Sequence, residues 1–326
     1  MGGSGRVAAN HAVASTIHIG ISERSANGDL VYGGWSHYGF DDADQALEAM
    51  RGHDVAIACA GARASEGRDR WTLDLDHDDF LRSLASKVAA ARAGNETTVP
   101  PLVVAALAPG AFTAEWALNA SAVLVGFLTG QETGRAFADV LLGDVNPAAK
   151  LPLTIHTDES ATATIPPSFA PRIEYTEGLN VGWRGLTHMP VAFPFGHGLS
   201  YTRFAYEWAR PLPGSVSTAG EEEVVAALHV RVTNIGTVAG SEVAQLYLAY
   251  PASAGEPPLV LRGFRKTGTL LPGGSEELAF GLTREGLSTW EERGGGAWRV
   301  ARGRFVALVG TSSRNTTLSH SFDVVV

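Results

Sequence analysis

One short stretch of the sequence places an acidic side chain among basic ones directly after an apolar run. The stretch is ACAGARASEGRDRW, residues 58–71, in which Glu66 stands between a serine and a glycine and close to Arg63, Arg68 and Arg70. A carboxylic acid on a loop at the mouth of a crevice is a candidate general acid, which contributes roughly 10²–10⁴ in rate when it is positioned on a substrate. The alternative is a solvated glutamate held by the neighbouring arginines.

The elements around this loop follow from hydrophobic periodicity. Residues 54–60 form an apolar run that predicts a strand buried on both faces, and two further runs of this kind lie at 101–110 and 121–130. Helical spacing of apolar residues, with acidic starts or closing glycines, predicts helices over 41–52, 78–94 and 131–143. Alternating strands and helices predict βαβ units and a mostly parallel sheet. Loops at the carboxyl ends of such strands line the ligand crevice, so we expect residues 61–71 there.

The second half of the chain has a different pattern. Seven prolines interrupt residues 146–206, a segment rich in aromatic residues and therefore expected to be packed. From about Val224 apolar and polar residues alternate, and turn residues separate about seven short strands within roughly 100 residues. This pattern is typical of an antiparallel β-sandwich.

Composition excludes several classes of function. The net charge is −9, which disfavours nucleic acid as a partner, and the longest apolar runs are too short for a membrane span. Neither a Walker lysine motif, nor G-x-G-x-x-G, nor a nucleophile elbow occurs, and the histidines show no metal-ligand spacing. We therefore expect no cofactor and no metal, with the histidines, His156 among them, at the surface. The single cysteine, Cys59, is expected to be a small buried apolar residue.

Several long motifs resemble glycoside hydrolase family 3. The segments DVAIACAGARASEGRDRWTLDL and GQETGRAFADVLLGDVNPAAKLPLTI resemble its second domain, an α/β sandwich. The segments NIGTVAGSEVAQLYLAY and GRFVALVGTSS resemble the fibronectin type III-like (Ig-like) domain of its β-glucosidases, and EYTEGLNVGWRGL with FPFGHGLSYTRFAY resembles the segment between the two. The resemblance implies an α/β domain over 1–160 that is truncated at its N-terminus, a packed connecting segment over 161–222, and an all-β domain over 223–326.

The resemblance also implies roles for the residues of the loop. In this family the motif S-E-G-x-D-R supplies the general acid/base, and Glu66 occupies that position here. Asp69 and Arg70 match the rest of the motif, whereas Arg68 stands where a tyrosine is usual. Together with Arg63, these residues are expected to bind substrate or to tune the ionisation of the acid.

Other matched residues are assigned structural roles. Glu132, with Gln131, is interpreted as a helix start, where a carboxylate near the N-terminus is favourable. Trp183 and Arg184 are interpreted as packing and hydrogen-bonding residues.

A retaining glycosidase needs a second carboxyl group, about 5–5.5 Å from the acid/base. In the family this nucleophile is an aspartate on a (β/α)₈ barrel, which these 326 residues do not contain. The resemblance therefore implies a β-linked glucoside or oligosaccharide as substrate, a barrel supplied in cis or in trans, and no activity of the chain alone. It also suggests a secreted or vacuolar parent protein, although this chain shows no signal peptide. The alternatives are a non-catalytic carbohydrate-binding or protein-interaction module and an inert fragment.

Overall fold

The structure, a computed structural model, describes residues 17, 21, 42–67, 70–161, 174–220, 222–292 and 295–325. The chain forms two compact units. The first, here called the α/β unit, comprises Met1–Val145, Ile155–Ile173 and Pro190–Ala192. The second, the sandwich unit, comprises Asn146–Thr154, Glu174–Met189 and Phe193–Val326. No helix among the described residues is long and apolar enough to cross a membrane.

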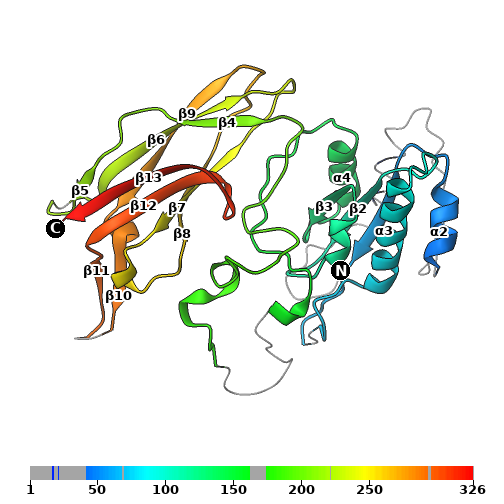
Figure 1. The fold of residues 1–326 in the computed structure, drawn as a ribbon, viewed down its shortest axis with the longest axis horizontal. Helices are drawn as coiled ribbons and strands as arrows, with labels where there is room; N and C mark the ends of the chain where they lie inside the picture. Colours follow the sequence, from blue (N-terminus) through cyan, green and yellow to red (C-terminus); the bar gives the residue numbers. More distant parts are fainter. Residues whose placement is uncertain are drawn as a thin grey trace. The chain divides into compact units, whose positions relative to one another are not determined.

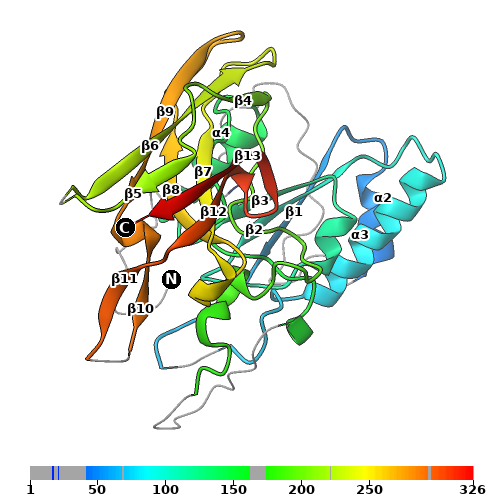
Figure 2. The same ribbon diagram turned by 60° about the vertical axis from the view of Figure 1, so that its left-hand side comes forward.

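A parallel sheet with strand order β1-β2-β3 is the centre of the α/β unit (Figures 1 and 2). The described elements of the unit, in chain order, are α2 (Ala43–Met50), β1 (Ala56–Gly61), α3 (Asp78–Ala93), β2 (Leu102–Leu107), η1 (Glu115–Leu118), β3 (Ala122–Gly126), α4 (Thr133–Leu141) and η2 (Glu159–Ala161). This order confirms the predicted alternation of strands and helices. The start of α4 also confirms the interpretation of Glu132, which is its N-cap residue.

Local sequence explains where these helices begin and how they pack. The Asp42 side chain caps α2 by accepting a hydrogen bond from the backbone N–H of Asp44 at 2.8 Å. α4 packs its buried Phe137 against one face of the sheet. A Cβ atom at Gly126 of β3 would lie 2.7 Å from the Phe137 ring, so the close approach of strand and helix requires glycine there. Figure 1 shows α2 and α3 on the opposite side of the sheet from α4.

Burial differs between the central strand and the two outer ones. β2 is almost wholly buried, as predicted, whereas β1 and β3 are mostly half-buried. Cys59 in β1 is exposed, so the prediction of a buried cysteine is wrong. Among the described strands β1 pairs with β2 alone, and its side chains are covered less than those of β2, which has a neighbour on each side.

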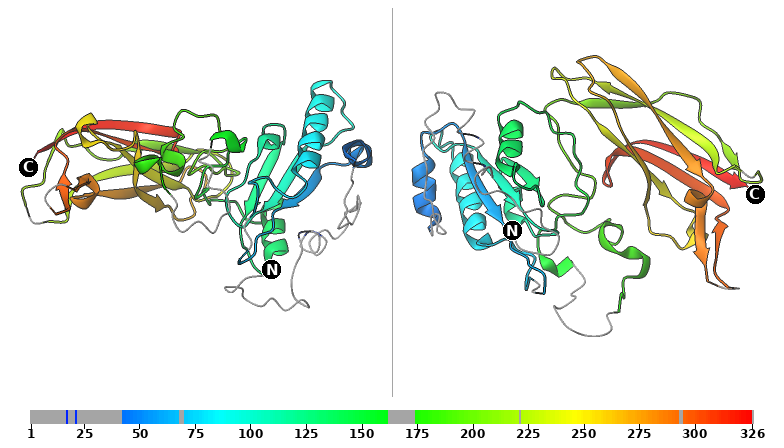
Figure 3. Two further views of the ribbon diagram at one scale, coloured as in Figure 1. Left: turned by 90° about the horizontal axis from the view of Figure 1, so that it is seen from below. Right: turned by 180° about the vertical axis from the view of Figure 1, so that it is seen from behind.

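The sandwich unit consists of two sheets and a separate hairpin, seen from two further sides in Figure 3. One sheet has the order β5-β13-β12-β7-β8, the other β4-β6-β9, and β10 pairs with β11. Its described elements are η3 (Gly178–Asn180), η4 (Gly182–Arg184), β4 (Phe204–Trp208), β5 (Ser215–Ser217), β6 (Val224–Asn234), β7 (Val243–Ala249), η5 (Ala252–Ala254), β8 (Val260–Lys266), β9 (Ser275–Thr283), η6 (Glu285–Leu287), β10 (Ser288–Glu291), β11 (Ala297–Val300), β12 (Gly303–Ser312) and β13 (Asn315–Val325).

The predicted β-sandwich is thus present, and it starts earlier in the chain than the sequence pattern indicated. Strands β4 and β5 fall within 161–222, the range expected to be a connecting segment, yet β4 pairs with β6 and β5 with β13. Both are short, at five and three residues, and therefore carry too little alternation to be read from sequence alone.

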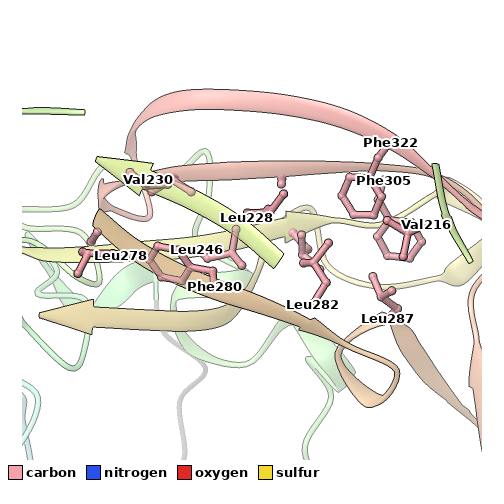
Figure 4. Close-up of a cluster of buried hydrophobic side chains, with 14 of the residues drawn as sticks. Val216, Leu228, Val230, Leu246, Leu278, Phe280, Leu282, Leu287, Phe305 and Phe322 are labelled. Carbon is pink, nitrogen blue, oxygen red and sulfur yellow. The ribbon is translucent and has the colours of Figure 1, made fainter. Parts of the chain in front are cut away.

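Alternating side chains of the two sheets form the core of the sandwich. Phe305 of β12 stacks on Phe322 of β13 with ring centroids 5.7 Å apart, and both are almost fully buried (Figure 4). Leu228, Leu246 and Phe280 face the same core from β6, β7 and β9. Burial of such side chains is the main stabilising term, at roughly 1.5–3 kcal/mol each.

β7 is buried on both faces rather than on one. The residues of its second face, Gln245 and Tyr247, are covered by the proline-rich segment: Gln245 Nε2 donates to the carbonyl of Gly196 at 3.0 Å, and Trp183 lies edge-on to Tyr247 at 5.6 Å. Trp183 also stacks on Phe195 at 5.0 Å. The packing role predicted for Trp183 is therefore confirmed.

A buried ion pair ties the start of the sandwich unit to strand β7. Lys150 Nζ lies 2.8 Å from Glu242 Oε1, with the two side chains 10% and 6% exposed. The ammonium also donates to the carbonyl of Gly198 at 2.9 Å, and the carboxylate accepts the backbone N–H of Val243 at 2.8 Å. Both charges are thus compensated by each other and by backbone groups, as buried charges must be.

Candidate active site

The loop that carries Glu66 is fixed at its base. It leaves the carboxyl end of β1 and returns at Asp76, whose backbone N–H donates to the carbonyl of Gly61 at 2.8 Å. Ala62 N–H donates to the carbonyl of Leu107 at the end of β2, at 3.0 Å. Residues 62–67 and 70–75 therefore belong to an excursion at the carboxyl edge of the parallel sheet, where the sequence predicted it.

Glu66 lies in a turn of this loop. It is exposed, and Gly67 after it has φ +74°, a left-handed conformation that favours glycine. The S-E-G sequence therefore has a local reason, because the turn favours a glycine directly after Glu66. Among the ion pairs between described residues, none involves Glu66.

The other predicted site residues do not form one cluster around the acid. Arg63 is 86% exposed and its Nε lies 3.6 Å from Asp76 Oδ2, a loose surface pair. Arg68 and Asp69 lie outside the described residues. Tuning of Glu66 by Arg63 or Arg68 remains a prediction.

Arg70 makes the most specific contacts of the set. Its Nη1 donates to the carbonyl of Ala111 at 3.0 Å, and its Nη2 donates to the carbonyls of Leu73 and Asp74 at 2.8 and 3.0 Å. The half-buried guanidinium thus joins the loop after β1 to the loop after β2. Three carbonyl acceptors suit a planar group with fixed donor directions, which a lysine could not replace.

Polar side chains hold the far end of the same loop. The Thr113 hydroxyl donates to the Asp74 carboxylate, and Glu159 accepts hydrogen bonds from the Thr72 hydroxyl, at 2.6 Å, and from the backbone N–H of Leu73. Together with Arg70, these bonds fix residues 70–76 on both sides. Such contacts restrict the conformations open to the loop and so lower the entropy lost when a substrate is bound.

A buried network lies where the loop enters α3. The Asp78 carboxylate, 6% exposed, accepts from Trp116 Nε1 at 3.0 Å and from Arg82 Nη2 at 2.7 Å, and Arg82 also pairs with Glu115 at 3.0 Å. Burial raises the pKa of Asp78, while the Arg82 guanidinium opposes that rise. This network connects α3 to η1 and explains the acidic start of the helix as structural.

Two observations go beyond the predicted set. Trp71, five positions after Glu66 on the same loop, is 80% exposed. The signal for it in the sequence was an aromatic residue directly after the acid motif.

His156 is buried, so the expectation of surface histidines is wrong for this residue. It is buried because it lies in a β-bridge with Thr113. Burial lowers the pKa of His156, and the Asp158 carboxylate opposes this effect. Within the described part of the chain, no three His, Cys, Asp or Glu side chains converge as a metal site.

Comparison with known proteins matches both units. The profile of the Glycosyl hydrolase family 3 C-terminal domain matches residues 1–201, and that of the Fibronectin type III-like domain matches residues 242–313. The chain is 36% identical over 309 residues to the probable beta-glucosidase L of Aspergillus terreus, and the match covers 87% of this chain and 40% of that protein.

Solved structures agree with this result. The beta-D-glucoside glucohydrolase of Trichoderma reesei is similar with a TM-score of 0.72 and 32% identity, over 87% of this chain and 42% of that one. The GH3 beta-glucosidase of Bifidobacterium adolescentis has a TM-score of 0.78 and 28% identity, over 99% of this chain and 47% of that one. The chain thus spans about 40% of the length of the curated relative. Since the profile of its C-terminal domain matches more than half of the residues, the chain belongs to glycoside hydrolase family 3.

Proposed function

We propose that the chain provides the general acid/base, Glu66, of a retaining β-glucosidase whose nucleophile lies on a (β/α)₈ barrel supplied in cis or in trans. The observation that carries the proposal is the position of Glu66: exposed in a turn, on a loop with a fixed base, at the carboxyl edge of a parallel sheet. The names of the relatives support the substrate class, a β-linked glucoside or oligosaccharide. A retaining mechanism accounts for the need for a second carboxyl group.

In the proposed reaction Glu66 acts twice. Its carboxyl proton passes to the glycosidic oxygen as the bond to the anomeric carbon breaks and the barrel carboxylate forms the glycosyl ester. The resulting Glu66 carboxylate then takes a proton from the water that attacks the same carbon, which releases the sugar and restores both groups. Each half-step moves one proton, so the group is returned to its starting state.

Arg70 and Trp71 have supporting roles in this proposal. Arg70 is a positioning residue, because its guanidinium is engaged by three backbone carbonyls of the loops beside the acid. Trp71 offers an exposed indole on the same loop, suited to contact the leaving-group side of a bound glucoside. Neither would carry a proton.

The decisive experiment compares leaving groups. Glu66→Gln is assayed with a family barrel present, on a 2,4-dinitrophenyl β-glucoside, whose leaving group needs little protonation, and on an alkyl β-glucoside, whose leaving group needs much. We expect the rate at which the glycosyl-enzyme forms to fall by roughly 10²–10⁴ on the alkyl glucoside and far less on the dinitrophenyl glucoside. Azide, which attacks without base assistance, should accelerate turnover of the dinitrophenyl glucoside by the variant and yield the β-glucosyl azide.

Glu132→Gln is the matched control. Glu132 is another exposed carboxylate, directly before α4, with its Oε2 3.1 Å from Arg135 Nη1. Its loss should leave the rates on both substrates unchanged. Equal rate losses on the two glucosides for Glu66→Gln, without azide rescue, would refute the acid/base role.

A further inference from the structure

The hairpin β10–β11 carries two exposed tryptophans side by side. Trp290 and Trp298 are directly opposite each other in the antiparallel pair, with ring centroids 5.6 Å apart and an interplanar angle of 72°. They are 53% and 57% exposed. Of the tryptophans in the described ranges, only Trp71 is more exposed. The hairpin extends beyond the ends of the two sheets (Figures 1 and 2).

The exposed pair continues a face that begins in the core. Side chains alternate along a strand, so Ser288 and Val300 point to the same side as Trp290 and Trp298. Ser288 is buried and Val300 packs against the core of the sandwich. Further along the hairpin the core ends while the apolar face continues, and the two indoles meet solvent.

The rings are held in place by the hairpin itself. Gly296 has φ +74°, and a Cβ atom there would lie 2.6 Å from the Trp290 ring, so the backbone covers part of that ring. On the other side of the hairpin Arg299 Nε pairs with Glu291 Oε2 at 3.0 Å. A preformed aromatic pair binds with a smaller loss of side-chain entropy than a mobile one.

Stabilisation of the hairpin alone does not account for this arrangement. Cross-strand aromatic pairs do stabilise hairpins. That effect needs only the surfaces where the rings meet, yet the two residues are 53% and 57% exposed. Exposed apolar groups gathered in one place indicate a binding surface more often than isolated ones do.

The size of the surface limits what it can bind. Two half-exposed indoles offer roughly 150–250 Å² of contact area. A stable protein interface buries about 800 Å² on each partner, so a second copy or a folded protein is a poor match. Nucleic acid is disfavoured because the chain carries a net charge of −9.

We infer that the Trp290–Trp298 pair of the sandwich unit is a binding platform for a β-linked glucan chain. A β-glucosyl residue has equatorial hydroxyl groups, so both faces of its ring present C–H groups that stack on an indole, and the ligand is neutral. The inference rests on membership of a family with β-glucosidases among its members, and not on the role of Glu66.

Affinity electrophoresis of the whole chain tests the inference. Mobility is measured in native gels with a soluble mixed-linkage β-glucan, with dextran, an α-linked glucan, as the control polymer. We expect retardation by the β-glucan alone, and about tenfold weaker affinity for Trp298→Ala, equivalent to about 1.4 kcal/mol. Trp298→Tyr, which keeps an aromatic face, should retain most of the affinity, and thermal melting checks that the variants fold.

A control variant separates this platform from other exposed aromatics. Phe264→Ala removes a 62% exposed ring from β8 of the same unit. This variant should bind like the wild type. Absence of retardation of the wild type, full binding by Trp298→Ala, or loss of binding by Phe264→Ala in its place would each overturn the inference.

Discussion

Replacement of Lys150 by methionine should destabilise the sandwich unit strongly. Methionine keeps most of the side-chain volume but leaves the Glu242 carboxylate, 6% exposed, without the cation that lies 2.8 Å away. Breaking a buried pair from one side costs about 3–5 kcal/mol, because the remaining charge is neither paired nor hydrated. For a unit of this size the melting temperature should fall by roughly 6–20 °C.

A double-mutant cycle separates the lost attraction from the stranded charge. Glu242→Leu in the Lys150→Met background removes both charges, and replacement of a buried pair by apolar residues is often neutral or stabilising. The double variant loses the hydrogen bond from the N–H of Val243, which is worth about 1 kcal/mol, so it should recover most but not all of the stability.

The assay is urea unfolding followed by circular dichroism and tryptophan fluorescence, with the transition of the sandwich unit fitted separately. Arg231→Met is the matched control: Arg231 also forms an ion pair in this unit, 2.9 Å from Glu207, but the side chains are 43% and 61% exposed. Its loss should cost about 0–1 kcal/mol. A Lys150→Met variant that lost no more than this control would refute the argument from burial.

Three further predictions concern the α/β unit. Gly126→Ala should destabilise the α/β unit by about 1–3 kcal/mol, because the new methyl group would lie 2.7 Å from the Phe137 ring. Urea unfolding measures this loss, and an unchanged urea midpoint would show that α4 can shift to make room for the methyl group. Asp78→Asn should gain stability relative to the wild type as the pH rises above 3.8, the ordinary pKa of aspartate. Burial raises the pKa of Asp78, so the folded state keeps the proton to a higher pH than the unfolded state and the wild type loses stability in this range. Melting temperatures from pH 3.5 to 6.5 check this, and a difference in melting temperature that does not change with pH would contradict it. Arg70→Lys should lower kcat when a family barrel is supplied, and native-state hydrogen exchange in residues 70–76 should become faster. The reason is that one ammonium group cannot satisfy three carbonyls. An unchanged exchange rate would contradict a positioning role for Arg70.

Local patterns in the sequence predicted the elements whose causes are local. Helix α3 is confirmed to within a residue of its expected range because an acidic start, regularly spaced leucines and Gly94 all act within the segment. β2 is confirmed as a buried strand because its apolar run is continuous. The position of Glu66 on a loop after β1 follows from the same reasoning, since the strand ends where the polar residues begin.

Features that depend on distant partners could not be predicted in this way. The exposure of Cys59 is set by which strands flank β1, and the burial of the second face of β7 is set by Trp183, about 60 positions earlier in the chain. The three carbonyls that engage Arg70 include that of Ala111, on another loop. A motif identifies Arg70 as part of a site, but only its contacts distinguish a positioning role from substrate binding.

The distribution of contacts along the Glu66 loop bears on how the proposed site would work. Hydrogen bonds concentrate at the base and along residues 70–76, whereas Glu66 and Trp71 are both open to solvent. General-acid catalysis gains from exclusion of water, and the described residues provide no cover for either side chain. In the proposed function the surface that brings the second carboxyl group must therefore also bring the cover. A loop that is rigid at its base and exposed at its turn is suited to this, because it presents the acid in a fixed place to a partner surface.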